Sequence, residues 1–237
     1  LTESGQRLYD YANTVLSEYD KLKKEIDMIR ASEEGTVELL VAYDILRYLT
    51  PDCILEFQKK YPNVTFSYME YPDRIVEKML LDKEGNVALS IGPFAGDCFD
   101  MKSLKKCSLG LLVYEEHSLA KKREATILDL EGEPLYLENS SFKLNEFIQS
   151  RCWNRGFEPD IVFETNGFDL CYKMCRLKRG ISVTIDFVHE DMNTEGLVMI
   201  PFAEDDMIWE IGLLTLKDRA MESSVEKFYK YIENYNS

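Results

Sequence analysis

Residues that carry most enzyme chemistry are scarce in this chain. Its 237 residues include two histidines, His117 and His189, and neither has a serine or cysteine nucleophile at a recognisable spacing. The patterns GxSxG and GxGxxG and the P-loop are absent. We therefore expect no enzyme activity, no cofactor and no metal centre.

Long apolar runs and basic residues are scarce as well. The longest apolar run, residues 109–114, is far shorter than the roughly 20 residues that a membrane-spanning helix needs, so we expect no membrane partner. Lys and Arg number 28 against 43 Asp and Glu, which gives a net charge of −15. Such a chain does not resemble a nucleic-acid binder. If the intact protein binds DNA, another segment must do so.

The cysteines form no recognisable framework. The six of them, none in a CxxC pair, are Cys53, Cys98, Cys107, Cys152, Cys171 and Cys175. In a chain of this length, this pattern predicts free thiols in a reducing cytoplasm. Cys171 and Cys175 have the i, i+4 spacing of one edge of a metal site or a sensing pair, but no other His or Cys completes the set. We expect both to be buried as small apolar residues.

The chain opens with the apolar pattern of a coiled coil. The apolar residues are spaced alternately by four and three, which is a heptad seam kept up for about three repeats. The seam consists of Leu8, Ala12, Val15, Tyr19, Leu22, Ile26 and Ile29. It predicts a helix over residues 3–32 that pairs two copies of the chain.

The remainder alternates between strand and helix patterns, and 45% hydrophobic residues suffice for a buried core. We expect strands at 37–42, 64–69, 87–91, 109–114, 135–137, 161–163, 181–185, 197–201 and 208–216. Helices are expected to end near 60, to span 73–81, 142–155 and 168–179, and to close the chain with Met221, Val225, Phe228 and Ile232 on one face. The first of these helices begins either after Asp44 or at Thr50-Pro51. This alternation predicts parallel sheets covered by helices, in two α/β lobes.

Short motifs spread along the chain resemble the LysR-type transcriptional regulators. The family's LTxxG segment appears at residues 1–5, its YLxP at 48–51, its FxxxYP at 57–62, its DLxGxPL at 129–135, its GFxP at 156–159 and its GI at 180–181. Their order and spacing carry the resemblance. Two positions depart from the pattern: Ala88 replaces an aspartate, and Ser118 replaces the proline of HPLA.

The resemblance implies a bacterial, cytoplasmic regulator with an effector-binding domain of the periplasmic-binding-protein-like type 2 fold. It implies a linker helix at 1–34, one lobe formed by 35–112 with 212–237, and a second lobe formed by 113–211. The chain would cross between the lobes twice, near 111–114 and 211–215. A winged helix that binds DNA would precede residue 1, and homodimers or tetramers would form. A small-molecule effector of unknown identity would bind between the lobes.

Residues that directly follow the strands face the expected cleft, because ligands of such folds bind at the carboxyl ends of the strands. The set comprises Tyr43, Asp44, Tyr71, Pro93, Asn139, Ser140, Ser141, Thr165, Asn166 and Thr184. Helix N-termini start beside several of them and favour anions. We expect a ligand carboxylate or similar group at the turn 139–141. The alternative is that its Asn and Ser residues only cap the helix.

Asp44 points to a different ligand chemistry. The family often has serine or threonine at this position, and that hydroxyl commonly contacts the effector. An aspartate would repel a carboxylate but would hold an amine or a sugar hydroxyl. A role as a plain N-cap is the alternative.

Two other classes of protein share this scaffold. A solute-binding protein of a transporter has the same fold, but the coiled-coil leader argues against it. A small two-lobed enzyme is the other rival, and the scarcity of histidine argues against that.

Overall fold

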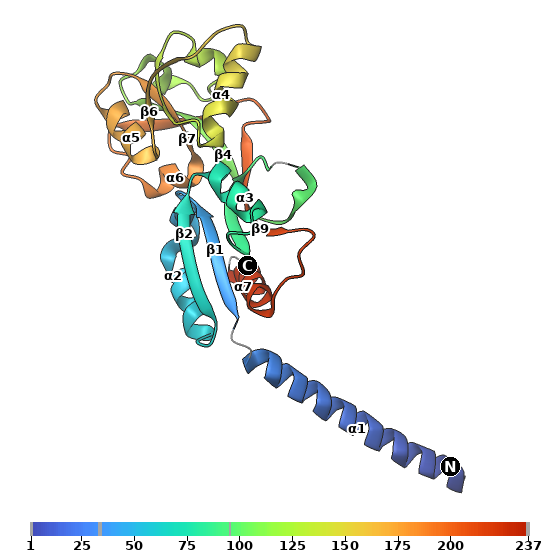
Figure 1. Cartoon of the computed structure of the whole chain (residues 1–237). Helices are drawn as coiled ribbons and strands as arrows, with labels where there is room; N and C mark the ends of the chain where they lie inside the picture. The colour runs from blue at the N-terminus through green and yellow to red at the C-terminus, as the bar shows by residue number, and fades with distance from the viewer. Residues whose placement is uncertain (1, 33–34, 95, 236–237) are drawn as a thin grey trace.

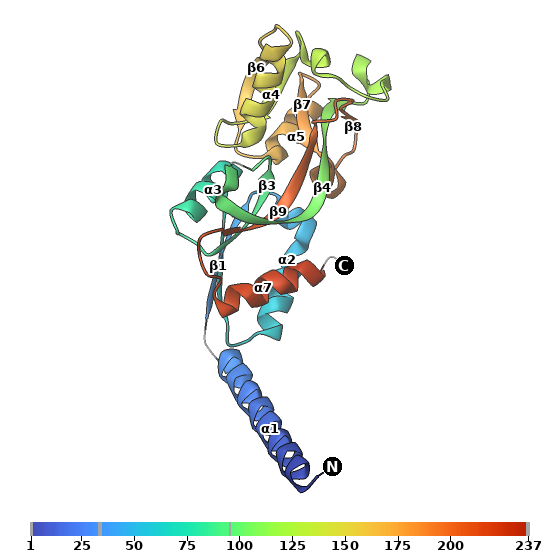
Figure 2. The ribbon, with the colours of Figure 1, turned by 90° about the vertical axis from the view of Figure 1, so that its right-hand side faces the viewer.

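A long helix stands apart from the rest of the molecule. The structure, a computed structural model, describes residues 2–32, 35–94 and 96–235, without the side chains of 3, 10, 20, 24–32 and 96. Helix α1 (Glu3–Ser32) extends away from the two lobes (Figures 1 and 2). Its seam residues Leu8, Val15, Tyr19 and Leu22 are all more than half exposed. The side chains of Ile26 and Ile29 lie outside the described residues.

The first sheet has the strand order β2-β1-β3-β9-β4. Strand β1 (Thr36–Ala42) pairs in parallel with β2 (Thr65–Tyr71) and β3 (Val87–Gly92), and β9 (Ile208–Leu216) runs antiparallel to β3. Helices α2 (Ile45–Lys60) and α7 (Ser223–Tyr235) pack together and on β1, while α3 (Asp73–Leu81) packs on β1 and β3. We refer to this unit as the first lobe.

The second sheet continues from β4 (Phe99–Tyr114), which pairs with β8 (Leu197–Pro201) and β7 (Ile181–Ile185). Strand β5 (Pro134–Glu138) joins β7 to β6 (Asp160–Thr165). Helices α4 (Lys143–Asn154), α5 (Phe168–Arg176) and α6 (Asp186–Asp191) belong to this second lobe, as do the 3-10 turns at Ser118–Lys121 and Ile127–Leu130. A further 3-10 turn, Gly96–Cys98, precedes β4. The mixed α/β fold is confirmed.

Two long strands connect the lobes (Figure 2). Strand β4 pairs with β9 through Ser108, and from Leu109 onwards it pairs with β7 and β8. The expected strand at 109–114 therefore starts ten residues too late, since the prediction follows the continuous apolar run and residues 99–108 carry three lysines. These residues form a half-exposed strand because their backbone groups pair with β9. That strand is about a hundred residues away in the sequence, so the pattern of residues 99–108 alone does not indicate the pairing.

Both expected start signals of α2 mark real features. The helix begins at Ile45 after Asp44, which has the left-handed φ of 68° and no capping hydrogen bond from its side chain. Thr50, at φ 58° and ψ 148°, interrupts the helix just before Pro51. Proline disfavours the helical conformation of the residue before it, which accounts for the kink. Asp44 is thus not a plain N-cap, and its carboxylate is left for other contacts.

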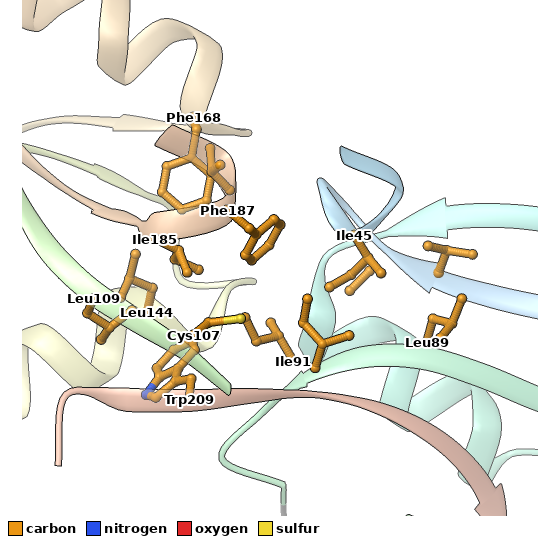
Figure 3. Packing of buried hydrophobic residues seen from close by; sticks show 14 of the residues in the cluster. Ile45, Leu89, Ile91, Cys107, Leu109, Leu144, Phe168, Ile185, Phe187 and Trp209 are labelled. Carbon is orange, nitrogen blue, oxygen red and sulfur yellow. The ribbon is translucent and has the colours of Figure 1, made fainter. Parts of the chain in front are cut away.

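The hydrophobic core continues through the junction between the lobes. Figure 3 shows Phe168, Ile185 and Phe187 of the second lobe facing Ile45 and Ile91 of the first. Trp209 of β9 closes one side of this junction and is 3% exposed. Closely packed residues of this kind stabilise the arrangement of the lobes that the structure shows. Among the described residues, no helix is long and apolar enough to cross a membrane.

The thiols differ sharply in accessibility. Cys98 is exposed, and the other five cysteines are buried. Burial raises the pKa of the Cys152 and Cys171 thiols to about 11, so their reactive thiolates are rare at neutral pH. We expect Ellman's reagent to label about one thiol in the native chain and all six in guanidinium. Rapid labelling of a second native thiol would contradict this burial pattern.

Candidate functional site

A small enclosed cavity lies where the two lobes meet. Its volume is about 20 Å³, which is enough for one water-sized group. The first lobe contributes Ala42, Tyr43, Asp44, Asp73 and Ile91, and the second lobe with β9 contributes Glu138, Phe142, Leu144, Phe168, Ile185, Phe187 and Trp209. No lysine, arginine or histidine lines this inner cavity among the described residues.

Three carboxyl groups line the inner cavity, and they differ in their partners. The Asp44 carboxylate accepts a hydrogen bond from Arg47 Nε at 2.5 Å. The Asp73 carboxylate accepts from the backbone N–H of Arg74 at 2.6 Å and of Lys143 at 3.0 Å. Glu138 is 4% exposed as a residue, and its carboxyl has no hydrogen bond or ion pair to any described side chain or backbone group.

The pKa values of these carboxyls are all displaced upwards. Burial, with a smaller contribution from the charges of Asp44 and Asp73, raises the pKa of Glu138 well above its ordinary value. Burial raises the pKa of Asp73 to about 6, although the nearby Lys143 opposes the shift. Burial also raises the pKa of Asp44 against the opposing effect of Arg47. The site therefore disfavours negative charge that no cation balances.

A wider cavity of about 500 Å³ adjoins the inner one and opens to solvent. Tyr43 and Asp44 line both cavities. The outer cavity is further lined by Leu46, Arg47, Thr50, Pro51, Glu70, Asn166, Gly167, Asp169 and Asp191. We call this outer cavity the mouth.

Arg47 joins the two lobes across the mouth. Its guanidinium donates to Asp169 at 3.1 Å and to Asp191 at 2.6 Å, in addition to Asp44. Asp169 lies on α5 and Asp191 on α6, whereas Arg47 lies on α2. One arginine side chain thus bonds three carboxylates from both sides of the cleft.

The N-terminus of α4 is already engaged within the chain. The carboxylate of Asp73, in the first lobe, accepts a hydrogen bond from the backbone N–H of Lys143, the first residue of α4. A carboxylate in this position stabilises the N-terminus of a helix. The preceding turn is closed internally, since Ser141 N–H donates to Asn139 Oδ1 and Asn139 Nδ2 donates to Asn166 Oδ1. The hypothesis of a ligand carboxylate at 139–141 loses one of the donors on which it relied.

The other expected cleft residues are dispersed. Asn166 lines the mouth, and Pro93 lines two open cavities beside α3 and α4. Thr184 is fully buried and bonds the hydroxyl of Tyr172 at 3.0 Å, while Thr165 is buried and donates to the carbonyl of Gly167 at 2.8 Å. Within the described chain, Thr165, Thr184, Tyr71, Asn139, Ser140 and Ser141 line none of these cavities.

Sequence reasoning missed most of the charged cleft residues. Asp73 begins a helix directly after Tyr71-Pro72, and Glu138 is the last residue of β5, so a search extended by one or two residues along each strand end would have found them. Nothing in the local sequence marks Arg47 as a bridge, because its partners lie 122 and 144 residues away.

On the side of the junction formed by α3 and α4, buried charges connect the lobes. Lys143 Nζ bonds the carboxylate of Glu77 and donates to the carbonyl of Ile91 at 2.7 Å. Glu77 is 6% and Lys143 8% exposed. Arg74 and Glu146 form a second, more exposed pair between α3 and α4. Ion pairs therefore connect the two lobes both at the mouth, through Arg47, and between α3 and α4, through Lys143 and Arg74.

Comparison with known proteins gives one family. The model of the LysR substrate binding domain matches residues 30–236. The transcriptional dual regulator GltC of Bacillus subtilis strain 168 is 23% identical over 239 residues, which cover all of this chain and 79% of GltC. The HTH-type regulator YwbI of the same organism is 25% identical over 185 residues, which cover 78% of this chain and 62% of YwbI. The chain thus spans less than two thirds of YwbI.

Solved structures show the same fold. The effector-binding domain of a BenM variant has a TM-score of 0.73 at 18% identity, over 85% of this chain and 94% of that domain. The effector-binding domain of QuiR in complex with shikimate has a TM-score of 0.72 at 18% identity, over 86% of this chain and 98% of that domain. HinK, a LysR family regulator from Pseudomonas aeruginosa, has a TM-score of 0.71 at 18% identity and covers all of this chain. At these identities the likeness extends to the fold alone.

Proposed function

Because the chain belongs to the LysR substrate-binding domain family, we propose that it is the effector-sensing part of a transcriptional regulator. A small molecule binds between the two lobes, and the occupied cleft shifts the population of regulator states. The observation that carries this proposal is the pair of adjoining cavities, which residues of both lobes line together. A ligand in contact with both lobes has different affinities for closed and open arrangements, as a sensor requires.

The proposal includes the rest of the regulator. DNA binding belongs to a winged helix outside these residues, and two or four copies of the chain assemble through α1 in the bacterial cytoplasm. The lobes comprise 35–112 with 212–237 and 113–211, and the change of partners along β4 supports a crossover there. The chain has no catalytic role in this proposal. The relatives, all regulators, lend no support to the alternative of a transporter's binding protein.

Asp44 is the cleft residue that we propose to contact the effector, through an amine or hydroxyl group. It lines both cavities, and the cap role that would otherwise account for it is not fulfilled. Tyr43 and Asn166 line the mouth and would contact the remainder of the ligand.

Thermal unfolding against a panel of amines, amino acids, organic acids, sugars and nucleotides tests this function. A ligand at 100 times its Kd stabilises the folded state by about 2.7 kcal/mol. For a domain of this size, that raises Tm by roughly 5–10 °C. With the identified ligand, Asp44→Asn should weaken binding by about tenfold or more, since it removes a charged partner. Unchanged affinity in Asp44→Asn would exclude the contact, and a panel without any stabilising compound would count against the sensor.

A further inference from the structure

We propose that the effector presents a primary ammonium group, and that this group enters the inner cavity between Asp44, Asp73 and Glu138. The inference rests on the proposed sensing function and specifies the chemistry of its ligand. A water-sized cavity suits a head group of the size of an ammonium ion. The rest of the ligand then lies in the mouth, which Tyr43 and Asp44 connect to the inner cavity.

The first argument is the charge of the two cavities together. Six carboxyl side chains line them, and Arg47 is the single cation among the described lining residues. The six are Asp44, Glu70, Asp73, Glu138, Asp169 and Asp191. A cleft lined with one sign of charge concentrates ions of the other sign. An anionic effector would instead meet carboxyls from both lobes.

The second argument is the carboxyl of Glu138, a residue that lines the inner cavity and is 4% exposed. Its backbone carbonyl accepts from Asn145 Nδ2 at 2.7 Å, but its carboxyl bonds no other described group. A buried polar group without a partner costs free energy, and nearly all such groups in proteins are hydrogen-bonded. A primary ammonium carries three N–H donors. Three carboxyls line one cavity, so they match these donors in number and are of the opposite sign of charge.

The walls supply the third argument. Five aromatic side chains line the inner cavity, and Phe168, Phe187 and Trp209 are each no more than 3% exposed. Figure 3 shows Phe168 and Phe187, from the second lobe, on one side of the junction and Trp209, from β9, on the opposite side. Phe142 and Tyr43 complete the set with ring centroids 6.1 Å apart. Aromatic faces attract cations, and most strongly where water is excluded.

A metal ion fits these residues less well than an organic cation does. Among the described residues, no group of three or more His, Cys, Asp and Glu side chains has an arrangement that could hold a metal ion. Calcium requires oxygen ligands at about 2.3–2.6 Å, whereas an ammonium reaches its acceptors through longer N–H bonds. Burial raises the pKa values of Asp44, Asp73 and Glu138, and a cation beside these carboxyls would oppose that shift by stabilising their charged forms.

The test is calorimetric titration of the full chain with butylamine and 1,4-diaminobutane, beside butyrate and butan-1-ol of matched length. We expect the amines to bind, and the acid and the alcohol to bind at least tenfold more weakly. Binding should persist at 0.15 M salt, because buried charges are screened much less than surface charges. Glu138→Gln should weaken amine binding by about tenfold or more and leave the fold intact, since glutamine has the same shape.

Glu124→Gln is the matched control, because it removes the same charge from an exposed side chain outside both cavities. It should bind amines as the parent chain does. Equal weakening in both variants, or loss of binding at 0.15 M salt, would mean a diffuse attraction to a chain of charge −15 and would overturn the proposal. Binding of butyrate alone, or of calcium alone, would overturn the ammonium class while leaving a ligand sensor. Failure of both amines in a folded sample would overturn it as well. The thermal-unfolding panel then tests the sensing function separately. A stabilising compound of another class would support a sensor, and no stabilising compound would count against it.

Discussion

Replacing Lys143 with methionine should lower the free energy of unfolding by about 3–5 kcal/mol, the cost of leaving one partner of a buried ion pair unpaired. The methionine keeps much of the apolar stem but removes the cation that bonds Glu77. Of the described donors, Glu77 would retain the hydroxyl of Ser90, at 3.2 Å. For a domain of this size the loss corresponds to a decrease in Tm of roughly 6–20 °C, measured by circular dichroism or calorimetry.

Two further variants distinguish the effect of breaking the buried ion pair from the effect of removing any positive charge. Lys102→Met breaks the exposed pair of Lys102 with Glu233 and should cost less than about 1 kcal/mol. Adding Glu77→Gln to Lys143→Met should restore much of the lost stability, because no uncompensated charge then stays buried. Equal melting temperatures for the Lys143 and Lys102 variants would show that the buried pair contributes nothing special to holding the lobes together.

Changing Val15 and Leu22 to lysine should convert the assembled protein into monomers. Both side chains are more than half exposed on α1 of a single chain, and we propose that they meet their counterparts in a second copy. Each such residue contributes about 1.5–3 kcal/mol when fully buried, and a dimer would lose four of them. The dissociation constant should therefore rise by more than about a thousandfold. Sedimentation equilibrium over a range of protein concentrations measures this directly.

Asn13→Lys with Ser17→Lys is the matched control for the seam. It adds the same charge to the same helix at exposed positions that lie off the heptad seam. These substitutions should leave association within a few-fold of the parent chain. A parent chain that is monomeric at all concentrations, or equal effects of both pairs, would refute pairing through this face of α1.

The sequence predicted helices and strands best where the apolar pattern of an element and its start and stop signals lie within a few neighbouring residues. Strands β7 and β8 and helix α3 occupy the expected residues, since their apolar residues and bounding glycine or aspartate signals lie within each segment. It failed for residues 99–108, whose lysines and serine are tolerated because one strand face is exposed. It also missed α6, a helix of six residues that is too short to show a helical period.

The candidate site was predicted only in part, and the reason lies in the order of the chain. Strand ends identified Tyr43 and Asp44 because the carboxyl edge of a parallel sheet is a local property. Glu138 became a cavity residue only through its proximity to Asp44 and Asp73 across the lobes. Ser140 and Ser141 fit the sequence rule equally well, yet they line neither cavity, and Asp73 accepts from the first N–H group of the helix that follows them.

The sequence by itself determined the class of fold, the long amphipathic helix at the N-terminus and the regulator family. Periodicity and short motifs are patterns of residues that are close together in the sequence, so they can be recognised without the structure. Only the tertiary structure decided which charges meet: Arg47 with Asp169 and Asp191, Lys143 with Glu77, and three carboxyls around one cavity. Electrostatic interactions depend on distance and burial rather than on separation along the chain. The ion pairs that join the two lobes are therefore made between residues 66 or more positions apart.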